Sequence, residues 1–276
     1  MLEIGTYTKL TVDRIKSPGA YLINDEDEDV LLPNKYVSDD LEVGDQIEVF
    51  IYLDGEERIV ATTENPFIKL NDFAVLKANN VNKIGAFMDW GLEKDLFIPF
   101  REQELKIKEG NSYLVYMYFD RQTERLVGST KLSKYLDNSD HQLQIRDKVD
   151  LIVWSSSDLG TKVIINKKHL GLLYSNEVFK KLKFGQQITG FIKKTRSDNK
   201  IDVSLEEISY KNIEPNAQKI LTLLEKNNGH LKLNDKSHPD EIQDVLGISK
   251  KAFKKALGSL YKKRLITIDR KGISLK

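Results

Sequence analysis

Three segments of the chain repeat one spacing of two glycines. The second glycine of each pair follows the first after 25 residues: Gly19 and Gly44, Gly85 and Gly110, Gly160 and Gly185. Shifts of 66 and then 75 residues align the stretches between them without a gap, so that "GAYLI" falls on "GAFMD" and "GTKVI". Self-similarity at a fixed interval indicates that one small folding unit occurs three times.

Each segment also shows the alternation that is typical of strands with one buried face. Beyond the second glycine, apolar residues occupy every second position: Ile47, Val49 and Ile51; Tyr113, Val115 and Met117; Ile188 and Ile192 on either side of Gly190. With the stretches before and after the first glycine, and a last one beyond a polar turn, each segment contains five short strands. So many strands in so few residues favour a small closed barrel of the OB type, because closure removes exposed strand edges.

The last quarter changes from a period of two to a period of about 3.6. "NAQKILTLLEKNN" predicts a helix after Pro215, and "LKL" predicts a short strand. Ser237 and Gly247 are expected to cap a second helix, and Ser249 is expected to begin a third. The closing "LITIDRKGISL" predicts a hairpin. Helix, strand, two helices and hairpin is the order of a winged helix-turn-helix domain.

The predicted fold is therefore mainly β with a C-terminal α+β module. Three tandem barrels are expected over residues 1–66, 67–138 and 139–211, and the winged helix over residues 212–276.

Charge is unevenly distributed along the chain. The net charge is −10 over residues 1–70, zero over 71–138, +4 over 139–213 and +7 over 214–276. This gradient predicts that a polyanion binds the second half. The chain has no cysteine, which excludes disulfides and cysteine zinc sites. It shows neither a secretory signal nor an apolar run long enough to span a membrane, so a cytoplasmic protein without a membrane partner is expected.

"GAFMDWGLEKDLFIPFREQ" and "GLLYSNE" resemble the S1 RNA-binding domain, an OB-fold family. The resemblance extends over residues 3–206 as three copies. It implies binding of single-stranded RNA, with messenger RNA as the expected partner, by stacking of bases on rings and by contacts to basic side chains. The S1-like barrels 2 and 3 are expected to carry this surface.

The resemblance also implies which residues contact RNA. They are Phe87, Trp90, Phe100, Arg101, Asp120 and Arg125 in the second copy and Lys162, Tyr174, Arg196 and Lys200 in the third. The first copy offers Tyr21, Pro33, Asp54 and Arg58. The copies depart from the family pattern. None has the histidine of the third strand, Lys162 stands where a ring is expected, and the last hairpins of copies two and three are one residue longer than the first.

Basic residues line the predicted third helix and the tip of the predicted wing. They are Lys250, Lys251, Lys254, Lys255, Lys262, Lys263, Arg264, Arg270 and Lys271. They are expected to contact nucleic acid, although a solvated helix face would show the same pattern. Three S1-like barrels before a winged helix resemble the conserved virulence factor B family. That resemblance implies RNA binding and post-transcriptional control of gene expression, including virulence factors.

Two other functions stay open at this point. The winged helix would read duplex DNA in a transcriptional regulator whose barrels bind protein, or the chain would be a ribosome- or polymerase-associated scaffold. An enzyme is not expected, because no phosphate-binding loop or HExxH motif is present. His230 and His238 have no third metal ligand near them in the sequence. No metal, cofactor or small-molecule substrate is expected.

Five consecutive carboxylates, Asp25 to Asp29, do not fit a calcium loop, which requires glycine where Val30 stands and glutamate where Tyr36 stands. The repeat alignment places them in the turn between strands two and three. We interpret them as a solvated turn that makes the first barrel a poor RNA binder. In the alternative interpretation, the run faces a basic partner or the chain's own basic C-terminal module.

Overall fold

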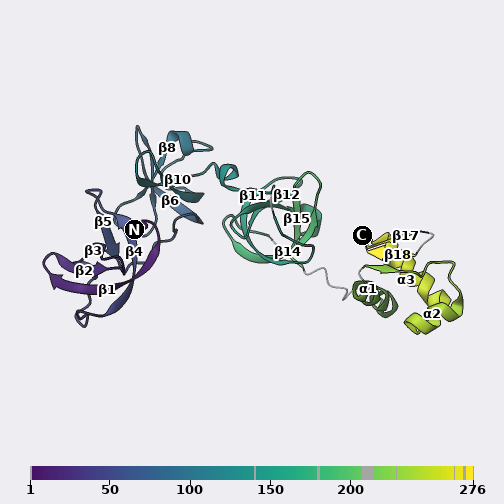
Figure 1. Cartoon of the computed structure of the whole chain (residues 1–276). Coiled ribbons are helices and arrows are strands. Elements are labelled where there is room, and N and C mark those ends of the chain that lie inside the picture. Colours follow the sequence, from purple (N-terminus) through teal and green to yellow (C-terminus); the bar gives the residue numbers. More distant parts are fainter. Residues whose placement is uncertain are drawn as a thin grey trace. The chain divides into compact units, whose positions relative to one another are not determined.

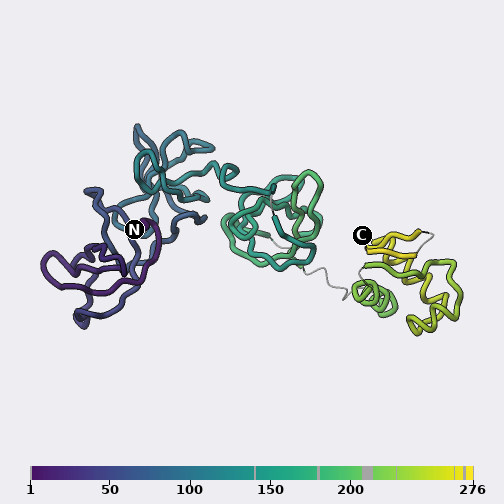
Figure 2. The backbone as a smooth tube through the Cα atoms, in the orientation of Figure 1, coloured from purple at the N-terminus to yellow at the C-terminus, as the bar shows by residue number. Residues whose placement is uncertain are grey.

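The computed structural model describes residues 2–139, 141–178, 181–206, 214–227, 229–263, 265–269 and 272–275. The chain forms two compact units, residues 1–207 and residues 208–276. Strands make up the first unit, and the helices α1, α2 and α3 belong to the second (Figure 1). Figure 2 traces the backbone through both.

Each of the three repeats contains five strands in the same order. The first has β1 (Tyr7–Lys16), β2 (Gly19–Ile23), β3 (Asp29–Pro33), β4 (Gln46–Leu53) and β5 (Ile59–Thr62). The second has β6 (Phe73–Val81), β7 (Gly85–Asp89), β8 (Leu96–Pro99), β9 (Ser112–Asp120) and β10 (Arg125–Ser129). The third has β11 (Lys148–Ser156), β12 (Gly160–Ile165), β13 (His169–Tyr174), β14 (Gln187–Thr195) and β15 (Ile201–Ser204). The predicted fold class is confirmed.

Strand pairing closes the first and third repeats into barrels in the order β1-β2-β3-β5-β4 and β11-β12-β13-β15-β14. The second repeat differs from the expected closed barrel. Its sheet runs β10-β9-β6-β7-β8, and β8 and β10 contact each other without a ladder of hydrogen bonds among the described residues. Because its five strands follow one another as in the other two repeats, the second repeat is called the second barrel. Short 3₁₀ turns follow the third strands (Asn34–Tyr36, Phe100–Glu102 and Ser175–Glu177), and another follows β10 (Leu132–Tyr135).

The first glycine of each pair lies where two strands approach closely. Gly19, Gly85 and Gly160 are paired with Pro33, Pro99 and Tyr174, so the register follows the alignment. A Cβ on Gly19 would lie 2.0 Å from the carbonyl oxygen of Leu32, and the other two positions are equally tight. Only glycine fits there without moving the backbone.

The second glycine of each pair is required for a different reason. Gly44, Gly110 and Gly185 all have positive φ, which side chains with a Cβ rarely adopt. Each donates its N–H over 2.8 Å to a carbonyl of the first strand, beside a bulge that recurs in β1, β6 and β11. The two glycines of each pair therefore satisfy two different backbone constraints that occur in all three barrels.

The last hairpin of the third repeat was predicted to be one residue longer than that of the first, and this prediction is wrong. The hairpin of β14 and β15 spans Arg196 to Lys200, the same length as Asp54 to Arg58 in the first barrel. The additional residue is a bulge in β14 between Ile192 and Lys194. In the second repeat the loop itself is longer, because Asp120 pairs with Arg125.

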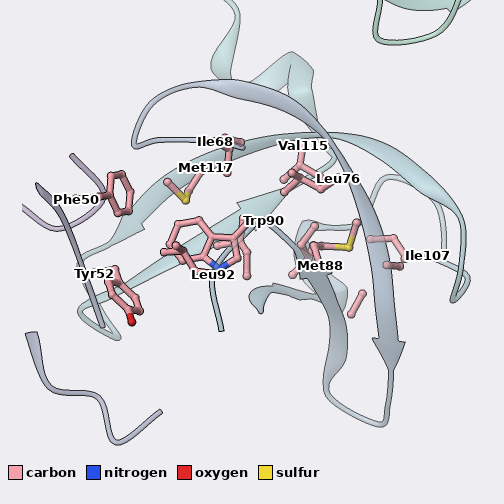
Figure 3. Packing of buried hydrophobic residues seen from close by; sticks show 14 of the residues in the cluster. Phe50, Tyr52, Ile68, Leu76, Met88, Trp90, Leu92, Ile107, Val115 and Met117 are labelled. Atoms are coloured by element: carbon pink, nitrogen blue, oxygen red, sulfur yellow. The ribbon is translucent and has the colours of Figure 1, made fainter. Parts of the chain in front are cut away.

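The hydrophobic core of the second barrel includes side chains of the first barrel, which also has a separate core of its own. Phe50 and Tyr52 of β4 pack with Trp90, Leu92 and Met117 of the second barrel (Figure 3). The second and third barrels meet through a smaller cluster of Phe73, Leu114, Leu132, Ile152 and Ile164, and through an ion pair of 2.6 Å between Lys167 and Asp72. The three barrels are therefore joined by packed side chains as well as by the chain.

The second unit contains α1 (Pro215–Lys226), β16 (His230–Leu231), α2 (Pro239–Leu246), α3 (Lys250–Lys262), β17 (Ile266–Ile268) and β18 (Ile273–Leu275). The sheet order is β16-β18-β17, as in a winged helix. Ser249 caps α3 by accepting from the N–H of Ala252, and Gly247 ends α2 in the left-handed region, both as predicted. The cap of α2 was predicted one residue too early: it is His238, whose N–H donates to Glu241, while Ser237 accepts from the N–H of Asn234.

Candidate nucleic-acid interface

An aromatic pair lies on the outer face of the second barrel. Phe87 on β7 is opposite Phe97 on β8, with ring centroids 5.2 Å apart and an interplanar angle of 41°. Both rings are half-buried, while Ala86, Met88 and Ile98 beside them point into the core. Strands two and three carry the ligand face of an OB-type barrel. The pair thus offers a surface on which bases can stack.

Phe97 was missed from the sequence. A signal was present, since "LFIP" alternates buried Leu96, half-buried Phe97 and buried Ile98. The same alternation in β7 places Phe87 outward, and the repeat register sets the two rings opposite each other.

A groove of about 680 Å³ brings together most of the residues predicted in the second repeat. Its lining includes Phe87, Phe97, Arg101, Asp120 and Arg125. The first barrel contributes Leu53 and Glu57 to the same groove. Phe100, the remaining ring, is 43% exposed on the 3₁₀ turn and is not part of the lining.

Both arginines of the groove are paired with carboxylates. Nη2 of Arg101 lies 2.9 Å from Oδ2 of Asp120, and Nη2 of Arg125 lies 2.5 Å from Oε2 of Glu57. The two guanidinium groups are more than half exposed. Of the two carboxylates, Glu57 is 46% exposed and Asp120 only 12%. An exposed ion pair contributes only about 0–1 kcal/mol, so a phosphate can replace Glu57 at low cost.

Trp90 does not have the role that the sequence predicted. It borders the groove, but its ring is 4% exposed and packs edge-on against Phe50 at 5.9 Å and Tyr52 at 6.5 Å (Figure 3). Its Nε1 donates to the carbonyl oxygen of Lys94. A ring held in this way has no face left for a base. Trp90 joins the first two barrels.

The third barrel presents a polar site on the corresponding face. The guanidinium of Arg196 binds Asp202 through Nε and Nη2, both at 3.0 Å, and Nη2 also donates to the hydroxyl of Tyr174. These hydrogen bonds from Arg196 to Asp202 raise the pKa of the guanidinium above its ordinary value. The ring of Tyr174 is half-buried beside it.

The two lysines predicted in the third repeat are exposed. Nζ of Lys162 lies 5.7 Å above the ring of Trp154, and Lys162 stands on β12 opposite Leu172. Lys200 forms a pair of 2.7 Å with Asp198 in its own hairpin. Lys162, Leu172 and Asp202 follow one another across three neighbouring strands, so they share one face.

The first barrel has the corresponding ring covered. The guanidinium of Arg14 lies 4.1 Å above the ring of Tyr21 and is held by Asp13 and Asp29. The carboxylate run forms the turn between β2 and β3, as predicted. Oδ1 of Asn24 accepts the N–H groups of Glu26 and Glu28 and shapes that turn.

The lysines of α3 lie away from its buried stripe of Phe253, Ala256, Leu257 and Leu260. Lys251, Lys254, Lys255, Lys262 and Lys263 are exposed and Lys250 is half-exposed. Lys255 pairs with Glu214 at 3.3 Å, and Lys250 donates to the carbonyl oxygen of Lys236. Arg264, Arg270 and Lys271, also predicted to contact nucleic acid, lie outside the described residues.

The described residues contain neither a cluster of metal ligands nor a helix suited to span a membrane. Among those residues, no group of three or more histidines or carboxylates lies close enough together to hold a metal ion. None of the helices in those ranges has the length and apolar character needed to cross a membrane.

Comparisons with known proteins agree with this architecture. The family model of the S1 domain matches residues 4–64, and the model of the CvfB-like winged helix domain matches residues 218–275. YitL of Bacillus subtilis (strain 168) is 27% identical over 94% of this chain and 89% of its own. Conserved virulence factor B of Staphylococcus epidermidis (strain RP62A) is 24% identical over 99% of this chain and 94% of its own.

A solved structure is similar to this chain over nearly its whole length. It is the crystal structure of a multidomain protein with nucleic acid binding domains from Streptococcus pneumoniae TIGR4, with a TM-score of 0.50, 27% identity, and coverage of 99% of this chain and 98% of that one. Both matched domains are of nucleic-acid-binding types. The predicted resemblance is thereby confirmed: the chain matches the S1 and CvfB-like winged helix models and is similar over nearly its full length to proteins named conserved virulence factor B.

Proposed function

We propose that the protein binds single-stranded RNA on the outer faces of barrels two and three, with the basic helix α3 as a further contact. The observation that carries the proposal is the pair of Phe87 and Phe97 facing the groove of the second barrel. Rings on strands two and three stack bases of any sequence, and the arginines beside them contact the backbone.

In this proposal Phe87, Arg101 and Arg125 contact RNA in the second barrel, with Asp120 holding Arg101. Lys162, Tyr174, Arg196 and Lys200 do so in the third. Phe100 adds an exposed ring at the edge of the second site. On α3 the contacts are the exposed lysines. The name of the staphylococcal relatives, conserved virulence factor B, supports a role in virulence. On the proposed RNA binding, that role is post-transcriptional control of gene expression, including virulence factors.

The test is binding of a fluorescent single-stranded RNA by the double variant Phe87→Ala with Tyr174→Ala. Each lost stacking contact removes about 1–3 kcal/mol, so affinity should fall by at least tenfold. The melting temperature should change little, because both rings are half-exposed on the outer face.

Phe184→Ala is the matched control, since this ring is 49% exposed in the connection before β14 and belongs to neither β12 nor β13. It should leave RNA affinity unchanged. Unaltered affinity of the double variant would rule out the proposed face.

The lysines of α3 favour a second candidate function, reading of duplex DNA by the winged helix. Competition between single-stranded RNA and duplex DNA for the full chain separates the two. Lys251→Ala with Lys254→Ala should weaken RNA binding if α3 serves the RNA site. Loss of duplex binding alone, with RNA affinity intact, would assign α3 to DNA.

A further inference from the structure

Strand five of the third barrel contains an acid where the other two barrels have valine. Asp202 pairs with Leu172 as Val60 pairs with Leu31, and Val127 holds the corresponding place in "RLVGS". The two valines are 3% and 4% exposed, and Asp202 is 7% exposed. A buried carboxylate is costly unless it is paired. The fold does not require an acid here, so its reason lies in the partner that it binds.

That partner is Arg196, which Asp202 holds in one orientation. Nε donates a hydrogen bond of 3.0 Å to Oδ2 of Asp202, and Nη2 lies 3.0 Å from Oδ1 in the ion pair. The hydrogen bond from Nη2 to the Tyr174 hydroxyl fixes the plane of the guanidinium further. Within the described ranges, the hydrogen bonds and the ion pair of the Arg196 side chain use Nε and Nη2, and Nη1 takes part in none of them. The guanidinium therefore presents Nη1 donors in a fixed direction, beside a half-exposed tyrosine ring.

The pair also has no net charge. An arginine with a free charge attracts phosphate from any direction, whereas one neutralised by a buried carboxylate keeps only its directional hydrogen bonds. Arg101 of the second barrel also binds a nearly buried carboxylate, but only through Nη2, and its side chain is 59% exposed. Arg196 is 35% exposed and contacts Asp202 through both Nε and Nη2, so it is held more firmly in place.

We propose that Asp202 is a positioning residue that turns Arg196 into a reader of RNA bases. A base stacks on Tyr174 and places its acceptor atoms against Nη1 of Arg196. Guanine fits best, because O6 and N7 are adjacent acceptors and arginine is their commonest partner. Lys162, on the same face, contacts the phosphate. This inference rests on the proposed RNA binding and adds the base preference of the third barrel.

The test uses the full chain with Asp202→Val, which installs the residue of the other two barrels. Four single-stranded RNAs of equal length, uniform except for two central nucleotides (GG, AA, CC or UU), are compared by anisotropy at several salt concentrations. The wild-type protein should prefer the GG oligonucleotide by about tenfold. In Asp202→Val the preference should fall to within about twofold. Arg196 then gains a free charge, so the salt slope should steepen by about 0.7.

Asp198→Val is the matched control, because it removes an equal charge from the same hairpin and frees Lys200 instead. It should steepen the salt slope in the same way and keep the preference for GG. Asp202→Asn should behave like Asp202→Val, which excludes an effect of side-chain size.

A preference for GG that survives in Asp202→Val at equal melting temperature would overturn the inference. So would a wild-type protein that binds the four RNAs equally or prefers another base. A wild-type protein that binds none of them would instead overturn the proposed RNA binding itself.

Discussion

Phe87 and Trp90 lie three residues apart and have opposite surroundings. Phe87 alternates outward on β7 and keeps a half-exposed ring, while Trp90, just beyond the end of the strand, enters the core shared by two barrels. Both look alike in sequence as rings near an expected ligand face. Trp90 is buried because the neighbouring barrel packs Phe50 and Tyr52 against it, and no such contact covers Phe87 among the described residues.

Trp90→Ala should therefore act on stability. Removal of a large buried ring costs about 3–5 kcal/mol, because the cavity that it leaves collapses only in part. Denaturant unfolding of the full chain should show this loss, whereas Phe87→Ala should shift the midpoint far less. RNA affinity measured well below the midpoint should be nearly unchanged for Trp90→Ala, and a large loss of affinity in a stable variant would show that the ring contacts RNA after all.

Glu57 and Asp202 could not be assigned from the sequence. Each matters only through a partner. Glu57 binds Arg125 of another barrel, 68 residues away in the sequence. Asp202 binds Arg196, whose position beside it depends on the bulge in β14. A carboxylate in a polar turn or on a strand gives no local sign of such a partner. The valines at the places equivalent to Asp202 were the one available hint.

At the scale of elements, the glycine pairs made the barrels predictable. Each glycine marks a local backbone requirement, a close approach or a positive φ, and local requirements are visible in a sequence. Packing between barrels was not predicted, because it depends on how complete barrels meet. The run "VFIY" in β4 did carry a signal: four consecutive buried residues indicate a strand covered on both faces.

Helix α3 contains a glycine that packing does not explain. Gly258 is exposed in the middle of the helix, and a Cβ there would meet nothing within 4 Å. Gly258→Ala should stabilise the second unit by about 1 kcal/mol, because alanine loses less backbone entropy in a helix.

Thermal unfolding of the variant measures this gain. A lower nucleic-acid affinity in the same variant would indicate that a ligand approaches the backbone at Gly258, next to Lys254 and the exposed Tyr261. An unchanged or lower stability would contradict the expected gain.

At the scale of the whole molecule, the first barrel supplies an acid to the groove of the second. Glu57 holds Arg125 at 2.5 Å, and Lys94 of the second barrel donates to the carbonyl oxygen of Asp54. On the proposed RNA function, a phosphate must displace Glu57 before it can contact Arg125. The acidic first barrel thereby limits binding to its neighbour.

Glu57→Gln should raise RNA affinity by about two- to fivefold, because an exposed ion pair of up to about 1 kcal/mol no longer competes. Glu56→Gln is the matched control: it removes the same charge from the same hairpin, but Glu56 pairs with Arg58 of its own barrel. Anisotropy titrations at equal salt compare the two. Equal gains would show that the general charge of the first barrel matters and that the contact with Arg125 does not.

The core shared by the first two barrels has a consequence for how the repeats can diverge. A barrel that binds only a ligand is dispensable once its binding face is lost. The first barrel also covers Trp90 and Leu92, so its removal would uncover apolar surface of the second. Phe50 and Tyr52, which cover them, lie on the outward side of β4, while Val49 and Ile51 point into the barrel. The face that carries Tyr21 is therefore free to accumulate carboxylates while the chain still needs the outward side of β4. A duplicated domain can in this way change from ligand binding to structural support and remain indispensable.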